Sequence, residues 1–185
     1  MKLFAVRPAF SRWIAMALLV SAASVARAED KAPRPGPEVE KLGYFVGKWK
    51  VAGEVKETPL MPGGKFTSRE SCEWFTGKYA VICKGKGKGP MGPSASLGIM
   101  SYSTEEKAYL YYGVDNSPVA WATIPRGTLA DGVWTYEDES RMGGQLVKSR
   151  YVMKQAGKKS YTSTWSILGQ DGKWQTVMEA TATRE

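Results

Sequence analysis

The segment Cys72–Gly89 reads CEWFTGKYAVICKGKGKG, and two runs of strand-forming residues in it flank a turn signal at Gly77-Lys78. That arrangement is typical of a tight β-hairpin. A hairpin centred there places Cys72 opposite Cys83. A two-residue loop makes them a hydrogen-bonded pair and a four-residue loop a closer, non-hydrogen-bonded pair, and both allow a disulfide. The segment therefore predicts antiparallel β-structure with a Cys72–Cys83 cross-link, and two free buried thiols are the alternative.

The second half of this segment contains a literal G-x-G-x-x-G, at Gly87, Gly89 and Gly92. A phosphate-binding loop of this pattern stands between a strand and a helix. The following PSASLGIMSYS is typical of another strand, so a nucleotide-binding loop is excluded here. A period of two instead places lysines on an outer face and glycines on an inner face. The outer residues are Lys84, Lys86 and Lys88, and the inner ones include Gly85 and Gly87, which we expect to leave a hollow.

The same alternation continues along the chain and is interrupted by turn residues. It predicts ten strands, at residues 48–57, 64–75, 79–89, 95–103, 107–114, 118–129, 133–140, 145–155, 160–169 and 173–183. Regularly spaced strands with tight connections predict an all-β fold. We expect an antiparallel up-and-down barrel, because closure removes exposed strand edges; a sandwich is the alternative. Before the first strand, Val39, Leu42 and Phe45 have helical spacing and predict a short N-terminal helical turn.

Parity along the strands predicts which side chains line the interior, if the charged face of each strand points outward. A barrel of this size approaches the width that holds a small ligand, and aromatic side chains give a cavity flat, amphipathic walls. The predicted ligand-binding lining is Trp49, Trp74, Tyr112, Trp134, Tyr136, Trp165, Trp174 and Met178, with Gly85 and Gly87 beside them. Tyr151 and Tyr161 share the inward parity. The alternative is that these side chains only fill the core.

The first residues have the pattern of a cleaved secretory signal peptide. A basic start is followed by an apolar run over 13–25 and by Ala26-Arg27-Ala28, a small-x-small cleavage pattern. We therefore divide the chain into a signal peptide at 1–28, a flexible, charged and proline-rich arm at 29–37, and a barrel domain at 38–185. Export places the mature protein in the periplasm or outside the cell, where cysteines pair.

Net charge limits the expected partners. The chain has 26 basic and 18 acidic residues and a formal net charge of +8. Residues 1–28 hold four of the basic and none of the acidic residues, so cleavage leaves +4. This mild charge permits an anionic partner but does not require one. Export argues against nucleic acid, and we expect no transmembrane segment in the mature protein.

The chain contains no histidine. This absence excludes histidine-ligated haem or zinc and every catalytic constellation that relies on imidazole. The acidic run Glu137–Glu139 lacks the ligand spacing of a calcium loop and fits a solvated strand end. We therefore expect no metal, no cofactor and no catalytic residue that the sequence can name, while chemistry by carboxylate, tyrosine or lysine stays open.

The stretch LGYFVGKWKVAGE, Leu42–Glu54, resembles the short helix and G-x-W motif that open lipocalins and other calycin-type barrels. LGIMSYSTEEKAYLYYGVD (Leu97–Asp115), GKWQTVMEATAT (Gly172–Thr183) and the cysteine hairpin are together similar to an uncharacterised bacterial family of exported, lipocalin-like barrels, described only as a domain of unknown function. The resemblance covers nearly all of the mature chain. It implies a ten-stranded barrel with an internal pocket and transfers no catalytic residue. Nitrobindin-like haem barrels also open with G-x-W, but their haem-binding histidine has no counterpart here.

These observations leave three classes of function. We favour an exported barrel that binds a small, largely apolar molecule in its interior. One alternative is a surface-contact protein that binds an anionic glycan or membrane through the lysine stripe at 84, 86 and 88. The other is a histidine-independent isomerase or cyclase on the same barrel, so whether the protein is an enzyme depends on which class holds.

Overall fold

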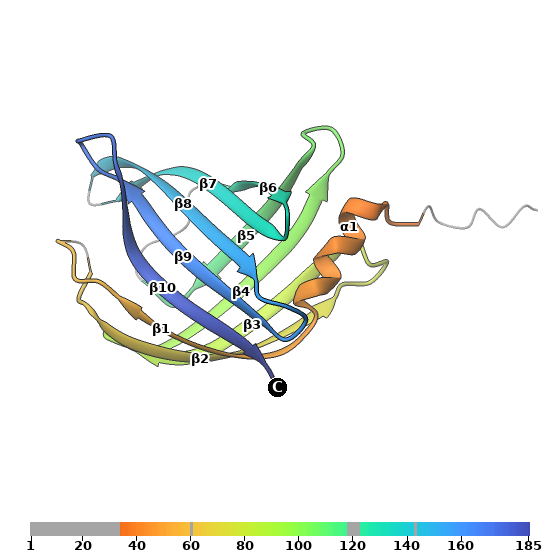
Figure 1. Ribbon diagram of the computed structural model, residues 1–185, viewed down its shortest axis with the longest axis horizontal. Coiled ribbons are helices and arrows are strands. Elements are labelled where there is room, and N and C mark those ends of the chain that lie inside the picture. The colour runs from red at the N-terminus through yellow and green to blue at the C-terminus, as the bar shows by residue number, and fades with distance from the viewer. Residues whose placement is uncertain (1–33, 60, 118–122, 143) are drawn as a thin grey trace, which may run out of the picture. The chain divides into compact units, whose positions relative to one another are not determined.

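Ten antiparallel strands form a closed barrel in the order β1-β10-β9-β8-β7-β6-β5-β4-β3-β2 (Figure 1). The computed structural model describes residues 34–59, 61–117, 123–142 and 144–185, so the predicted signal peptide and most of the predicted arm lie outside the described residues. The strands are β1 (Gly47–Val55), β2 (Gly64–Trp74), β3 (Ala80–Gly89), β4 (Gly92–Ser103), β5 (Ala108–Asp115), β6 (Arg126–Ala130), β7 (Val133–Met142), β8 (Gln145–Gln155), β9 (Ser160–Leu168) and β10 (Trp174–Arg184). The predicted up-and-down barrel is confirmed.

Closure depends on the pairing of β1 with β10. The register runs from Trp49 opposite Arg184 to Val55 opposite Met178. The other edge of β1 is covered by β2 over the whole length of β1. Each of the ten described strands therefore has two hydrogen-bonded neighbours, which is the arrangement of a closed barrel.

A short helix, α1 (Pro37–Lys41), and a 3-10 turn, η1 (Leu42–Phe45), close one end of the barrel. Val39, Leu42 and Phe45 are buried there, so the predicted helical turn is confirmed. Figure 1 shows α1 at the end of the barrel where the C-terminus lies. Neither helix in the described ranges is long and apolar enough to span a bilayer.

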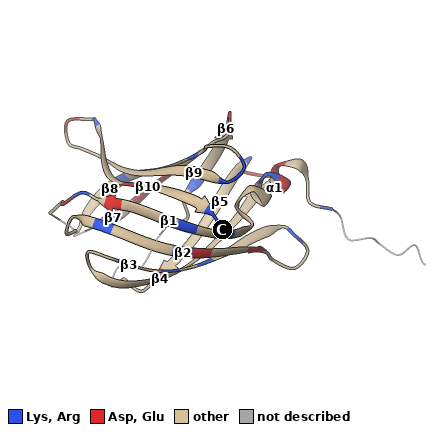
Figure 2. Ribbon diagram, turned by 60° about the horizontal axis from the view of Figure 1, so that its bottom comes forward, with Lys and Arg blue, Asp and Glu red and all other residues tan. Residues whose placement is uncertain are grey.

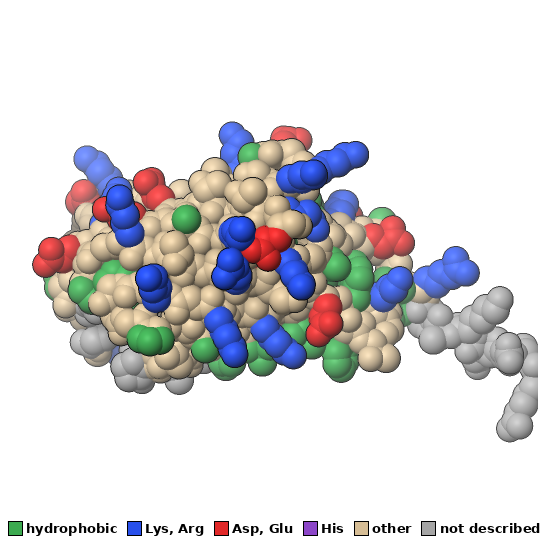
Figure 3. Space-filling view, turned by 90° about the horizontal axis from the view of Figure 1, so that it is seen from below, with side chains coloured by type: hydrophobic (Ala, Val, Ile, Leu, Met, Phe, Trp, Pro, Cys, Tyr) green, Lys and Arg blue, Asp and Glu red, His purple; other side chains and the backbone are tan. Residues whose placement is uncertain are grey.

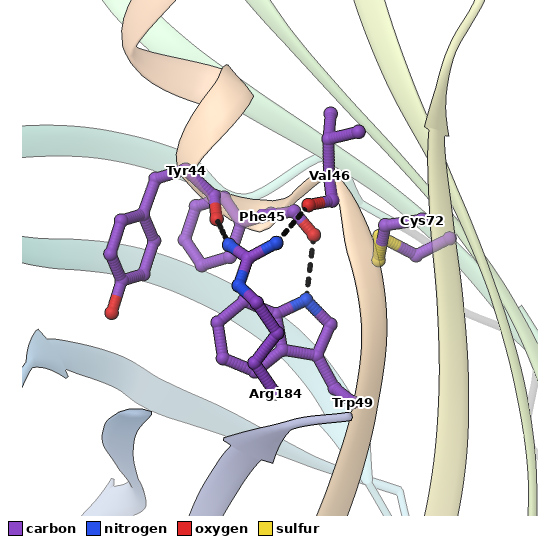
Figure 4. The surroundings of a disulfide bond; sticks show 7 residues. Tyr44, Phe45, Val46, Trp49, Cys72 and Arg184 are labelled. Carbon is purple, nitrogen blue, oxygen red and sulfur yellow. Dashed lines mark hydrogen bonds between the residues drawn. A yellow bond between two sulfur atoms is a disulfide. The ribbon is translucent and has the colours of Figure 1, made fainter. Parts of the chain in front are cut away.

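We call α1 and η1 together the plug (residues 37–45). Arg184, at the end of β10, ties the plug to the barrel wall (Figure 4). Its Nη2 donates a hydrogen bond of 2.7 Å to the carbonyl oxygen of Tyr44, and its Nη1 donates one to the carbonyl oxygen of Val46. The guanidinium also stacks on the Trp49 ring, 4.4 Å from the ring centroid. These charge-assisted contacts satisfy carbonyl groups that end the 3-10 turn without a helical partner.

Aromatic rings fill the plugged end by edge-to-face packing. The ring centroids are 5.2 Å apart for Phe45 and Trp134, 5.0 Å for Trp49 and Tyr161, and 4.5 Å for Tyr109 and Trp134. Such pairs contribute about 0.5–1.5 kcal/mol each beyond their area burial. Trp49 and Trp134 are completely buried in this cluster, so their main role is to stabilise the fold.

The largest departure from the predicted strands concerns β6. It begins at Arg126, whereas alternation predicts a strand from residue 118, and residues 118–122 lie outside the described ranges. Only two register pairs join β5 to β6, Tyr109 with Gly127 and Leu110 with Arg126. Beyond these pairs the Tyr111 amide donates to the Pro125 carbonyl at 3.3 Å, and Pro125 has no N–H to return a second hydrogen bond.

A disulfide links Cys72 and Cys83, which are direct cross-strand neighbours with a Cα–Cα distance of 4.0 Å. The Phe75 amide donates to the Ala80 carbonyl at 2.8 Å, so residues 76–79 form the loop. The four-residue alternative is therefore correct, and it makes the cysteines a non-hydrogen-bonded pair. The bond staples β2 to β3 beside the plug (Figure 4).

Replacing both cysteines, Cys72→Ser with Cys83→Ser, should lower the free energy of unfolding by about 2–4 kcal/mol, because the cross-link restricts the unfolded chain. Urea unfolding followed by circular dichroism measures the loss. Reduction of the wild-type protein serves as the matched treatment and should have a similar effect. Equal stability of the oxidised wild type and the double variant would contradict a structural role for this bond.

Candidate functional site

The inner face of β2 carries a carboxylate. Burial alternates along β2, and Glu70 shares the less exposed face with Cys72 and Trp74. Glu70 is the register partner of Gly85 on β3, and a Cβ placed on Gly85 would lie 3.6 Å from Glu70 Cγ. Because Gly85 is buried, the half-buried Glu70 side chain points into the barrel.

The charge of Glu70 acts on tyrosines from three other strands. Burial raises the pKa of Tyr111, Tyr151 and Tyr161, and the charge of Glu70 raises each of these pKa values further. A hydrogen bond with Ser163 opposes the shift of the pKa of Tyr151, which still reaches about 12. These phenols therefore stay neutral at physiological pH and keep an O–H that can be donated.

Glu70 has no partner within the described part of the chain. No cation forms an ion pair with its carboxylate there, and no group donates a hydrogen bond to it. Burial alone raises its pKa above the ordinary value of 4.5. Carboxylates removed from water are normally paired or hydrogen-bonded, so an unpartnered one inside a barrel is a candidate functional group.

Glycines on the inner wall make room for tyrosine rings. A Cβ on Gly98 would lie 2.6 Å from Tyr111 Oη, and a Cβ on Gly127 would lie 2.6 Å from the Tyr136 ring. The centroids of the Tyr111 and Tyr136 rings are 6.2 Å apart. These positions must stay small because a side chain there would displace the rings that border the Glu70 site.

Two buried polar atoms of the interior have no hydrogen-bond partner among the described residues: Trp134 Nε1 in the plugged end and Tyr136 Oη next to Tyr111. Tyr136 is only 3% exposed and interacts electrostatically with Tyr111. A buried donor without a partner costs about 1–3 kcal/mol. The interior thus holds hydrogen-bonding capacity that the described residues do not use.

The predicted lining residues divide into three groups. Trp49, Trp134 and Tyr136 are buried inside, and Trp74 lies beneath the plug, 3.2 Å from where a Cβ on Gly43 would lie. Trp165 is the register partner of both Tyr151 and Met178 on the inner side of the wall. Tyr112 and Trp174 lie outside.

The predicted inward orientation of Tyr112 is wrong. Tyr112 is 40% exposed, whereas its neighbour Tyr109 is 3% exposed and belongs to the core. The prediction takes Lys107, the charged residue at the start of this strand, as pointing outward, which would make Tyr112 point inward. Lys107 lies in a turn, with a φ of 51°. A residue with positive φ is not part of the extended alternation, so Tyr109 and Tyr111 point inward instead.

The predicted inward orientation of Trp174 is also wrong. A β-bulge between Thr176 and Met178 adds a residue to β10 and reverses its parity. Trp174 therefore lies on the outer wall, where the Arg150 guanidinium stacks 4.1 Å from its ring centroid. Met178, beyond the bulge, has Trp165 as its register partner.

The glycines of β3 face inward and the lysines outward, as alternation predicts. Lys84, Lys86 and Lys88 are exposed. The expected hollow does not extend to Gly85 and Gly87 themselves, where even a Cβ would not fit. A Cβ on Gly85 would lie 2.5 Å from Ser96 Oγ, and one on Gly87 would collide with the carbonyl oxygen of residue 67. These glycines allow neighbouring strands to approach closely instead of leaving space.

The sequence contained a signal for Glu70 that the outward-charge rule concealed. Glu70 has the same parity as Cys72 and Trp74, both of which belong to the inner face. Lys65, Arg69 and other charges of opposite parity mark the outer face of this strand. A charged residue on the face of a strand that otherwise carries buried residues is therefore the sequence pattern that identifies the interior carboxylate.

The geometry defines an up-and-down β-barrel with one plugged end and a polar, aromatic layer beyond the plug. The chain belongs to the DUF1579 family, described as a protein of unknown function, whose sequence profile matches residues 34–184. The resemblance to a family of unknown function is confirmed at this level. No curated protein matches the chain.

Two solved structures are similar in fold. The S-type phycobiliprotein lyase CPES from Guillardia theta has a TM-score of 0.54 and 12% identity, covering 79% of this chain and 91% of its own. Rv2717c from M. tuberculosis has a TM-score of 0.58 and 10% identity, covering 82% of this chain and 99% of its own. At these identities the likeness shows the fold alone.

The variant Glu70→Gln should be more stable than the wild type at pH 7. The folded state holds the Glu70 proton more tightly than the unfolded chain, so this group favours folding below its ordinary pKa of 4.5. That contribution is lost as the pH rises through the raised folded-state pKa. Urea unfolding between pH 4 and 8 should therefore show a flatter pH dependence for the variant.

Glu73→Gln is the matched control, because Glu73 is exposed on the same strand. It should retain the wild-type pH dependence. If Glu70→Gln proved less stable than Glu73→Gln at pH 7, Glu70 would have a stabilising partner, and its description as an unpartnered carboxylate would be wrong.

Proposed function

We propose that this protein is an exported barrel that binds a small, largely apolar molecule in its interior. The exposure of inward-facing side chains beyond the plug carries the proposal. Ser96 faces Gly85 on the inner side of the wall and is nevertheless exposed, while Phe66 and Trp165 are partly exposed. Side chains inside a closed sheet reach solvent only where the interior opens, so this end supplies an entrance.

The wall beyond the plug has the composition of a small-molecule site. Phe66, Trp165 and Met178 supply apolar surface, while Glu70 and Tyr151 supply a few polar groups. Such sites are mostly apolar, with a small number of placed hydrogen-bonding groups that orient the ligand. A similar fold in a protein named as a phycobiliprotein lyase is compatible with a small-ligand role.

Two observations support export of the mature protein to the periplasm or the cell exterior. The first is the predicted signal peptide at residues 1–28. The second is the Cys72–Cys83 disulfide, since disulfides persist in oxidising compartments and are rare in the cytosol.

Trp165 and Trp174 allow the binding position to be tested, because they lie on opposite sides of the wall. A brominated aliphatic alcohol quenches tryptophan fluorescence only on contact. We expect Trp165→Phe to remove most of the saturable quenching that the wild type shows, because the ligand lies beside Trp165. Trp174→Phe is the matched control and should retain it. Loss in the control alone, or no saturable quenching in the wild type, would contradict binding inside the barrel.

A basic outer face supports a second candidate, contact with an anionic glycan or membrane. Lys50, Arg69 and Lys86 are direct cross-strand neighbours on β1, β2 and β3. Glu185 offsets part of this charge, with its Oε1 3.2 Å from Arg69 Nε and 3.5 Å from Lys50 Nζ. Figure 3, which views the side occupied by β1–β3 in Figure 1, shows basic side chains gathered there. Like charges in register destabilise a sheet, so binding to an anion is a reason to retain them.

The triple variant Lys84→Ser, Lys86→Ser, Lys88→Ser tests this candidate. Each basic residue near an anionic membrane contributes about 1 kcal/mol, so binding to phosphatidylserine vesicles should weaken by roughly a hundredfold. Replacing Lys154, Lys158 and Lys159 by serine removes the same charge elsewhere and should have little effect. Equal losses in a vesicle co-sedimentation assay would indicate net charge alone, and no binding by the wild type would reject the membrane surface as a partner.

A further inference from the structure

The charges that face the barrel interior are mostly negative. Along the ten described strands, alternation directs four charged side chains inward: Glu70, Asp115, Asp138 and Arg184. Arg184 is engaged by the plug. The other three are carboxylates, so the open part of the interior is acidic although the chain as a whole is basic. Figure 2 shows acidic and basic positions interspersed on the ribbon.

Glu70 differs from the other two carboxylates in having no partner. Asp115 lies at the end of β5 and accepts a hydrogen bond of 2.8 Å from the Ser117 amide. Asp138 of β7 accepts one from the Thr123 hydroxyl. Both are thus engaged by loop residues, whereas Glu70 is unpartnered among the described residues and partly buried.

The surroundings of Glu70 are aromatic, and its register partner on β1 is Trp49. Its charge acts on Tyr111, Tyr151 and Tyr161, and Trp165 is the register partner of Tyr151. Aromatic faces attract cations, and a carboxylate among such rings adds a charged hydrogen-bond acceptor. An anionic ligand, by contrast, would place a second negative charge beside Glu70 in a poorly solvated site.

Tyr136 supplies an independent indication that this region is incomplete without a further group. Its Oη is buried and lacks a hydrogen-bond partner among the described residues. It lies next to Tyr111, whose pKa the charge of Glu70 raises. A molecule that enters beside Tyr111, or a water that accompanies it, would supply the missing hydrogen bond.

We infer that the interior site selects a small organic amine in its ammonium form. The ammonium group pairs with Glu70, and the apolar body of the ligand lies against Phe66, Trp165 and Met178. This inference rests on the proposed function of the interior and adds the chemical class of the ligand to it.

Three probes with one apolar body and different charges test this inference: naphthylmethylammonium, naphthylmethanol and naphthoate. Their dissociation constants are measured by isothermal titration calorimetry with the mature chain at pH 7 and physiological salt. We expect the wild type to bind the ammonium probe about tenfold more tightly than the alcohol, as a charged hydrogen bond provides, and the carboxylate least tightly. Glu70→Gln should remove the preference for the ammonium probe, and Glu73→Gln should retain it.

The outcomes separate this inference from the function on which it rests. If the alcohol binds as well as the ammonium probe, or Glu70→Gln retains the preference, the amine inference fails while interior binding stands. If naphthoate binds best, an anion is the ligand class and the inference is wrong. If no probe binds the folded wild type, both fail. Glu70→Asp, which keeps the charge, should preserve the order of the three probes even if Glu70→Gln does not fold.

Discussion

The pairing of β1 with β10 is the constraint on which the rest of the structure depends. It turns a meander of ten strands into a closed wall, and closure gives every inward-facing side chain a common interior. It also brings Arg184 opposite Trp49, so the guanidinium can reach the carbonyl groups that follow the 3-10 turn. The plug, the aromatic cluster and the position of Glu70 all follow from this one register.

The interior combines side chains that stabilise the fold with polar groups that packing does not require. At the plugged end, rings such as Trp49, Trp134 and Tyr161 are buried in edge-to-face contacts that stabilise the fold. Next to them the wall carries Glu70, the register partner of Trp49, and tyrosine hydroxyls that packing alone does not require. A desolvated carboxylate without a partner lowers stability, and such a cost is typically retained where a binding or catalytic role needs the group.

The fold was predictable because it depends on local pattern, and the site was less so because it depends on orientation. Period-two alternation and turn residues identify the barrel and the disulfide. The inward or outward direction of side chains is predicted from one charged residue in each strand, taken to point outward. Lys107 misleads this rule because it lies in a turn, so the direction of Tyr112 is predicted wrongly. The β-bulge in β10 has no recognisable sequence pattern, so the direction of the Trp174 side chain is also predicted wrongly. Glu70 is missed because it breaks the outward-charge rule itself, as functional residues often do.

The contact between Arg184 and Val46 spans 138 residues of sequence, which sets the order of events during folding. Until β10 has formed, one edge of β1 is unpaired and the plug lacks its hydrogen bonds from Arg184. Folding that depends on such distant contacts is slow compared with local hairpin formation. Under the proposed export, the same delay would keep the chain unfolded while it crosses the membrane. The strand that is synthesised last is therefore the one that completes the barrel.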